Sequence, residues 1–126
     1  MSRKIRVRGL APGGAAAVEF ALILPVLLLC ILGLIELGRM VWTQATLDYA
    51  VEAAARCRAI DQTHCPTEAA TQQFAIDNFM LPPDASFQVP LASCGYQATA
   101  TLSFVSVVPE LLPYSQTLTA SACFPT

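Results

Sequence analysis

The longest apolar stretch of the chain lies near its N-terminus. Residues 20–35 form a run of sixteen without a charge, and further apolar residues extend this run to 15–42. A membrane span needs about 20 mostly apolar residues. A helix over 15–42 would measure about 42 Å at 1.5 Å per residue. The pattern therefore predicts a transmembrane helix over residues 15–42 whose far end emerges from the bilayer.

The helical pattern continues beyond this run. Residues 43–60 are rich in alanine, the best helix former, and contain neither Gly nor Pro. Asp48, Glu52 and Arg56 recur every four residues and form one polar stripe. The Ala-rich remainder predicts a surface that packs closely, either on this chain's own globular part or on a helix of another subunit.

A second helix is predicted over residues 66–80. Pro66 suits a first helical turn, and Pro82-Pro83 ends the pattern. The apolar face of this helix is predicted to comprise Ala69, Ile76, Phe79 and Met80.

Alternating and β-branched residues predict strands in the C-terminal half. A short edge strand is expected at 86–91, and a hairpin from 96–107 and 117–124, with Leu118, Ala120 and Ala122 on one side. The fold class is therefore α+β. A long N-terminal membrane-spanning helix continues into a small module, 43–126, with a second helix and an antiparallel hairpin or sheet on the Ala-rich helix.

The charges are distributed unevenly. Only 13% of residues are charged, about half the usual share, which favours a membrane protein. The net charge of −2 indicates no broad basic surface for nucleic acid. All nine acids lie from Glu19 onward, whereas four of the seven basic residues precede the apolar run: Arg3, Lys4, Arg6 and Arg8. The positive-inside rule then predicts a cytoplasmic N-terminus and an extracytoplasmic module.

A removed secretory signal peptide is the alternative to an anchor. Its apolar core would span about 7–15 residues before a small-x-small site. Here the run is longer, and Glu36 and Arg39 follow it without such a site, so an uncleaved span is favoured. These two residues, three apart on one helix face, suit an intrahelical ion pair or a contact with a partner subunit.

Five cysteines bear on the compartment. Cys30 lies in the membrane run and is expected to act as a small apolar residue. The other four would be extracytoplasmic, where disulfides persist, and they allow three pairings. Cys57 and Cys65 bracket a tight connector, while Cys94 and Cys123 lie opposite each other if the hairpin centres near Val108-Pro109. We therefore expect Cys57–Cys65 and Cys94–Cys123.

No catalytic or metal-binding constellation stands out. His64 is the single histidine, and no second close Cys or His pair accompanies Cys65, so no metal is expected. A His-dependent triad lacks supporting motifs, and no Gly-rich phosphate loop is present. We expect neither an enzyme nor a cofactor.

Residues 15–29, AAAVEFALILPVLLL, resemble the TadE-like family. These are minor pilin-like proteins (pseudopilins) of tight adherence, or Flp-type, pilus systems. The resemblance continues through 35–39, IELGR, and into the Ala-rich helix with Arg56 near its end. It covers about a third of the chain; the C-terminal half is similar to the family only in pattern.

The resemblance implies that a prepilin peptidase removes residues 1–14 by cutting between Gly14 and Ala15. Glu19 is then the fifth residue of the mature chain, as pilin-like proteins require; a cut after Gly13 would make it the sixth. Glu19 and Phe20 are the implied assembly residues. N-methylation of Ala15 also follows family logic. The implied partners are the prepilin peptidase, other major or minor pilins, inner-membrane pilus assembly proteins and the lipid bilayer.

The sequence thus predicts a minor pilin of a tight adherence or type IV-like pilus that acts in assembly, initiation or adhesion. It would be a single-pass protein of the bacterial inner membrane and could enter the fibre. The alternative is a permanently anchored periplasmic scaffold or binding module of a secretion or assembly machine. Fibre association distinguishes the two.

Overall fold

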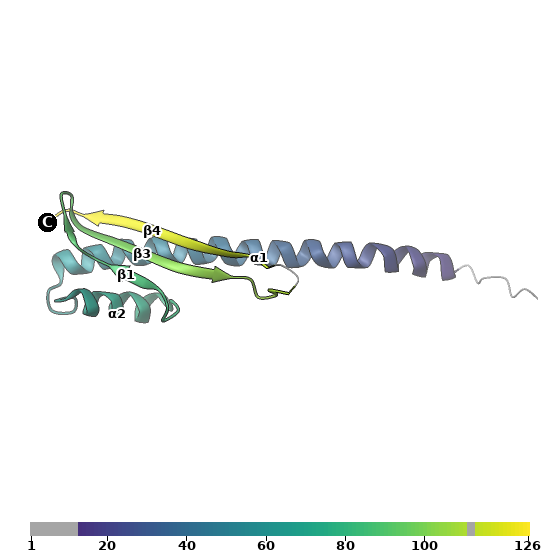
Figure 1. Ribbon diagram of the computed structural model, residues 1–126, viewed down its shortest axis with the longest axis horizontal. Helices are drawn as coiled ribbons and strands as arrows, with labels where there is room; N and C mark the ends of the chain where they lie inside the picture. The colour runs from purple at the N-terminus through teal and green to yellow at the C-terminus, as the bar shows by residue number, and fades with distance from the viewer. Residues whose placement is uncertain (1–12, 111–112) are drawn as a thin grey trace, which may run out of the picture. The chain divides into compact units, whose positions relative to one another are not determined.

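The computed structural model describes residues 13–110 and 113–126. It has the predicted α+β composition of one long helix, a second helix and an antiparallel sheet (Figure 1). In chain order the elements are α1 Gly13–Ile60, α2 Glu68–Phe79, β1 Ser86–Gln88, β2 Leu91–Ala92, β3 Gly95–Val105 and β4 Ser115–Phe124. The basic residues of the predicted leader lie outside the described residues.

The chain divides into two compact units between Ile35 and Glu36. The N-terminal unit contains the start of α1, and the C-terminal unit contains the rest of α1 and every other element. This division reflects packing within the chain. It tests neither the predicted leader boundary after Gly14 nor the predicted end of the membrane span at Trp42, and both stay predictions.

The sheet of the C-terminal unit is centred on β3. The β4 strand pairs antiparallel with it over its length, from Tyr96↔Phe124 to Val105↔Ser115. Because β4 occupies one edge, β1 and β2 share the other edge of β3. Alternate residues of the two long strands face inward and are buried, namely Ala98, Ala100, Leu102, Phe104, Leu118 and Ala120.

The core forms where this inner face meets one face of α1 (Figure 1). The α1 residues in the core cluster are Leu47, Ala50, Val51, Ala54 and Ala55. Alanine on both surfaces lets helix and sheet approach closely, and close packing is what gives a small core its stability. Of the two packing partners expected for the Ala-rich face, the structure selects the chain's own sheet. The predicted stripe of Asp48, Glu52 and Arg56 is exposed.

The α2 helix begins two residues later than predicted. Thr67 is its N-cap, and its hydroxyl accepts a hydrogen bond from Ala70 N at 3.2 Å. A threonine cap satisfies a free N–H of the first turn, so it fixes the helix start more strongly than a nearby proline. Pro66 therefore precedes the helix. The C-terminal end closes at Met80, in the left-handed conformation at φ 50°.

The predicted apolar face of α2 is also wrong in part. Ala69 is exposed and Met80 is 92% exposed, whereas Thr71 and Ala75 are fully buried. Thr71 tolerates burial because its hydroxyl donates to the Thr67 carbonyl at 2.8 Å. A satisfied hydroxyl no longer carries the cost that excludes polar groups from cores.

The expected edge strand at 86–91 is interrupted. Phe87 and Val89 are buried, but Leu91 is 67% exposed and belongs to β2. The backbone N–H of Val89 donates to Glu68 Oε1 at 2.8 Å rather than to β3, and Pro90 has no N–H to donate. These two residues divide the edge into β1 and β2.

The hairpin register differs from the expected one. Gln97, not Cys94, is opposite Cys123, so the two strands are related about Glu110 rather than Val108-Pro109. Cys94 instead lies in the turn between β2 and β3, where Ala92 pairs with Gly95. This turn, rather than direct opposition, brings the two cysteines together.

Candidate functional site

The described part of the N-terminal unit presents an apolar helix surface that no other described residues cover. Twelve large apolar side chains from Val18 to Ile35 are 39–72% exposed. The most apolar window of α1 is unburied, and the helix is long and apolar enough to cross a membrane. Large aliphatic side chains are what the hydrocarbon interior requires, so α1 is a candidate for single-pass anchoring.

The predicted processing and assembly residues occupy the start of α1. Gly14 and Ala15 lie in its first turn, one residue after Gly13 begins the helix. Glu19 is four residues beyond Ala15, on the same helix face, and is exposed. Phe20 is 63% exposed. The structure therefore places the only acid of this unit one turn beyond the predicted new N-terminus.

Glu36 and Arg39 form a salt bridge at the start of the C-terminal unit. The distance from Arg39 Nη1 to Glu36 Oε2 is 2.8 Å. The other carboxylate oxygen accepts the backbone N–H of Val107 at 2.9 Å, and the Arg39 guanidinium lies 5.2 Å from the centroid of the Phe104 ring. The pair therefore ties α1 to the segment after β3.

The contacts of Glu36 with Val107 and of Arg39 with Phe104 do not follow from the sequence. Glu36 and Val107 are 71 residues apart, and no local pattern signals a bond between a side chain and a distant backbone N–H. Both oxygens of Glu36 have partners within the chain, as the expected intrahelical ion pair requires, and a contact with another subunit stays a prediction.

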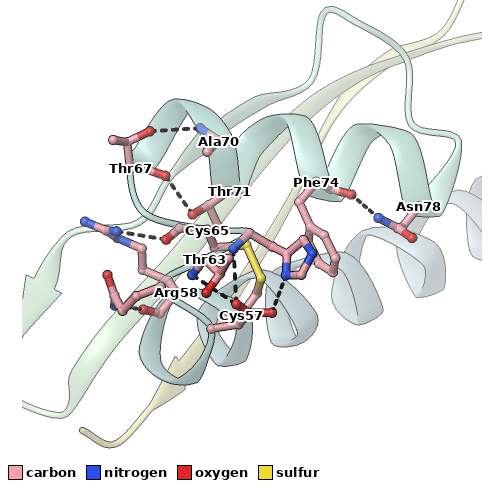
Figure 2. Close-up of a disulfide and its surroundings, with 12 residues drawn as sticks. Cys57, Arg58, Thr63, Cys65, Thr67, Ala70, Thr71, Phe74 and Asn78 are labelled. Atoms are coloured by element: carbon pink, nitrogen blue, oxygen red, sulfur yellow. Dashed lines mark hydrogen bonds and ion pairs between the residues drawn. A yellow bond between two sulfur atoms is a disulfide. The ribbon is translucent and has the colours of Figure 1, made fainter.

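The first disulfide joins the end of α1 to the connector before α2 (Figure 2). Cys57 and Cys65 have Cα atoms 5.8 Å apart, and Cys65 is fully buried. Arg58 Nη1 donates to the Cys65 carbonyl at 2.9 Å, and its guanidinium lies 5.3 Å from the centroid of the Tyr96 ring. One arginine thus connects the helix end, the connector and β3.

Asp61 organises the connector itself. Its Oδ1 accepts the backbone N–H groups of Thr63 and His64, and its Oδ2 lies 2.7 Å from His64 Nδ1. The hydrogen bond from the His64 backbone, then the one from its ring, hold the pKa of Asp61 below its ordinary value. His64 is exposed and serves here as a partner of Asp61.

The second disulfide joins Cys94 to Cys123, with Cα atoms 6.3 Å apart. Both predicted pairs are therefore present in the structure. Gly95, next to Cys94, has φ +120°, and a Cβ there would collide with the Phe124 carbonyl oxygen. Only glycine suits this close approach of β3 to the end of β4.

The described residues were also searched for a metal site and for a pocket with catalytic groups. Within residues 13–110 and 113–126, no three His, Cys, Asp or Glu side chains gather as a metal site. A groove of about 500 Å³ lies between α1 residues 42–46 and segment 78–82, and none of its lining side chains titrates. It offers no group for acid–base catalysis.

Comparison with known proteins gives a match to a family model. The family model described as TadE-like protein matches residues 14–56, which run from the predicted processing site to the Ala-rich part of α1. No curated protein and no solved structure matches the chain. The matched segment holds the exposed apolar surface, Glu19 and the Glu36–Arg39 pair. The match covers residues 14–56, about a third of the chain, and confirms the resemblance of this segment to the TadE-like family.

Proposed function

We propose that this protein is a minor pilin of a tight adherence, or Flp-type, pilus. The TadE-like match itself suggests a pilus-associated protein of such a system. One observation carries the finer proposal: the exposed apolar part of the matched segment, residues 15–35, contains one acid, Glu19, which lies one turn after Ala15. A soluble binding module requires neither an exposed apolar helix nor an acid at its start.

The first step is removal of the leader. A prepilin peptidase adds water across the Gly14–Ala15 peptide bond, which leaves a carboxylate on Gly14 and a free ammonium group on Ala15. The leader carries four of the chain's seven basic residues, which keep it cytoplasmic. Cleavage therefore removes most of the positive charge that holds the N-terminus at the inner face.

The second step pairs the new charge. The Ala15 ammonium and the Glu19 carboxylate lie one helical turn apart, within reach of each other or of the same groups on a neighbouring subunit. An unpaired carboxylate at the bilayer centre costs about 2.5–3.5 kcal/mol on insertion scales. This cost favours pairing of Glu19 with the Ala15 ammonium of a neighbouring subunit when helices associate during assembly. Glu19 would then set the axial position of one helix relative to the next.

The third step covers the apolar surface. In an aqueous fibre, neighbouring helices would bury the side chains that lipid contacts in the membrane, with a gain of about 25 cal/mol per Å² of apolar surface. The C-terminal unit would remain outside the membrane, stapled by two disulfides. Its partners in this scheme are other major or minor pilins and the inner-membrane assembly proteins, and it performs no catalysis and needs no cofactor.

Fibre incorporation tests the role of Glu19. We expect Glu19→Ala to be cleaved and anchored normally but lost from sheared fibres by tenfold or more, because its carboxylate can no longer pair. Glu52→Ala is the matched control, since Glu52 is an exposed acid on the same helix outside the apolar run. Undiminished incorporation of Glu19→Ala would count against the pairing step.

Processing is tested separately. Gly14→Leu should retain the leader, because a peptidase that requires a small residue before the scissile bond cannot accept leucine. Gly13→Ala is the control and should be trimmed normally. Normal trimming of Gly14→Leu, measured by mass spectrometry, would reject Gly14–Ala15 as the cleavage site.

A permanently anchored periplasmic scaffold is the second candidate. Arg39 and Trp42 are exposed just after the apolar run, and such residues commonly anchor a span at the interface. A scaffold would be found only in membranes and would tolerate Glu19→Ala. Recovery of the wild-type protein in sheared fibres would exclude it.

A further inference from the structure

One end of the C-terminal unit exposes apolar and aromatic side chains from two segments that are distant in sequence. We call this surface the loop-end surface. From α1 it includes Leu37, Val41 and Trp42, and from the ends of β3 and the β3–β4 connection it includes Val105, Val107 and Tyr114. All six are between 48% and 77% exposed. Both segments belong to the same end of the unit, because Val107 N donates to Glu36 and the Tyr114 hydroxyl lies 4.0 Å from Met40 Sδ.

The loop-end surface is fixed at the end of the apolar run. Val107 donates its backbone N–H to Glu36, and Glu36 directly follows Ile35, the last residue of the uncharged run. The Arg39 side chain packs on the Phe104 ring near the end of β3. The connection after β3 is therefore held beside the residues at which α1 would leave the hydrocarbon.

We propose that the loop-end surface lies in the lipid headgroup region at the extracytoplasmic face of the membrane. This inference rests on the proposed function, since it requires α1 to span the bilayer. In addition to Trp42 on α1, it gives the C-terminal unit a second contact with the lipid, formed by Val105, Val107 and Tyr114.

The chemistry of the surface suits headgroups rather than acyl chains. Tyrosine and tryptophan concentrate at membrane interfaces, where their rings meet apolar groups and their polar atoms meet water. Arg39 is partly exposed and can reach lipid phosphate while its stem stays on the Phe104 ring. Glu110, exposed in the same connection, prevents deep insertion. The contact is therefore shallow.

Brominated lipids provide a direct test, because bromine quenches tryptophan only at short range. Trp42 is the single tryptophan of the chain. In a Trp42→Phe background, Val107→Trp places the reporter on the loop-end surface. Leu91→Trp is the matched control: Leu91 is equally exposed, at 67% against 64%, but pairs with Tyr96 at the opposite end of β3. The full chain is reconstituted in phosphatidylethanolamine–phosphatidylglycerol vesicles.

Bromine placed near the headgroup end of the acyl chain should quench Val107→Trp at least twofold more than Leu91→Trp. Bromine near the chain end should quench it less. Val105→Trp serves as a second reporter, and formation of both disulfides verifies that each variant is folded. Both insertion orientations give the same readout, because each vesicle leaflet carries the label.

Two results would overturn the proposal, and they differ in what else they reject. If Trp42 of the wild-type chain is quenched but Val107→Trp and Val105→Trp behave like Leu91→Trp, the loop contact is wrong and the span stands. If Trp42 is also unquenched, the membrane span of the proposed function fails together with the contact. Absence of quenching combined with cellular crosslinks from position 107 to another protein would assign the surface to a protein partner.

Discussion

The two parts of α1 show how one helix can serve two environments. Between residues 18 and 35 its large exposed side chains are Leu, Ile, Val and Phe, and no other described residue of the chain buries them. Between residues 47 and 55 its packed face is mostly alanine and is buried against the sheet. Large aliphatic side chains extend outward to fill lipid or a groove on another helix, whereas alanine lets a sheet approach closely. Side-chain size, rather than apolar character alone, separates the two roles.

Truncation of leucine should show this difference most strongly. Leu47 is fully buried, so Leu47→Ala should lower the free energy of unfolding of the C-terminal unit by about 2–5 kcal/mol. Leu34 is 69% exposed in the other part of the helix, and Leu34→Ala should leave that free energy unchanged. Denaturant unfolding in detergent, followed through Tyr and Trp fluorescence, measures both. Equal effects would remove the distinction between the two parts.

The disulfides should have the next largest effect. In the chain-entropy model, the Cys94–Cys123 loop contributes about 3.6 kcal/mol and the shorter Cys57–Cys65 loop about 2.6 kcal/mol. Their sequence separations are 29 and 8 residues. Paired alanine variants, unfolded in denaturant, should follow this order. A larger loss from the Cys57–Cys65 pair would show that the contacts of Arg58 and the connector outweigh loop closure.

Burial predicts a different order for reduction. Cys65 is fully buried, whereas Cys94 and Cys123 are exposed. A mild thiol reductant applied to the folded chain should open Cys94–Cys123 first, because attack needs access to a sulfur. Mass mapping after alkylation detects the order. Simultaneous opening would mean that reduction follows global unfolding.

The smallest expected effect is the pH dependence of Asp61. Its pKa is lowered from 3.8 in the folded chain, so its stabilising contribution is present above that value and is lost as the pH falls through the lower folded value. Asp61→Asn keeps an acceptor but removes the charge. The difference in melting temperature between wild type and Asp61→Asn should be small at neutral pH and vanish in acid. A difference that grows in acid would contradict the sign.

Local patterns identified the elements of this fold but not the contacts between them. The run without charges, the Ala-rich segment and the alternation at Leu118 and Ala120 each report a local environment, and each matches the structure. Both disulfide pairs are confirmed, but the predicted reason for Cys94–Cys123 is wrong, because the turn between β2 and β3, rather than direct opposition, brings the two cysteines together. The predicted start of α2 is wrong because Pro66 also suits a first helical turn, whereas the hydrogen bond that makes Thr67 the cap depends on the folded position of Ala70 N.

The remaining features depend on distant partners. Val89 leaves the strand because Glu68 accepts its N–H, and Val107 is held by Glu36. No periodicity encodes either bond. Thr71 is likewise buried only because its hydroxyl donates a hydrogen bond to the Thr67 carbonyl, and its residue type alone does not predict that bond. The predicted processing residues at the start of α1 rest only on family resemblance, since helix geometry does not mark a cleavage site.

The mass of the N-terminal peptide tests the central claim most directly. The protein should be extracted from membranes of cells that contain the tight adherence machinery and digested for mass spectrometry. A mature chain that begins at Ala15, with or without one added methyl group, is the predicted result. A chain that keeps residues 1–14, or that begins elsewhere, would contradict the account of this protein as a processed minor pilin.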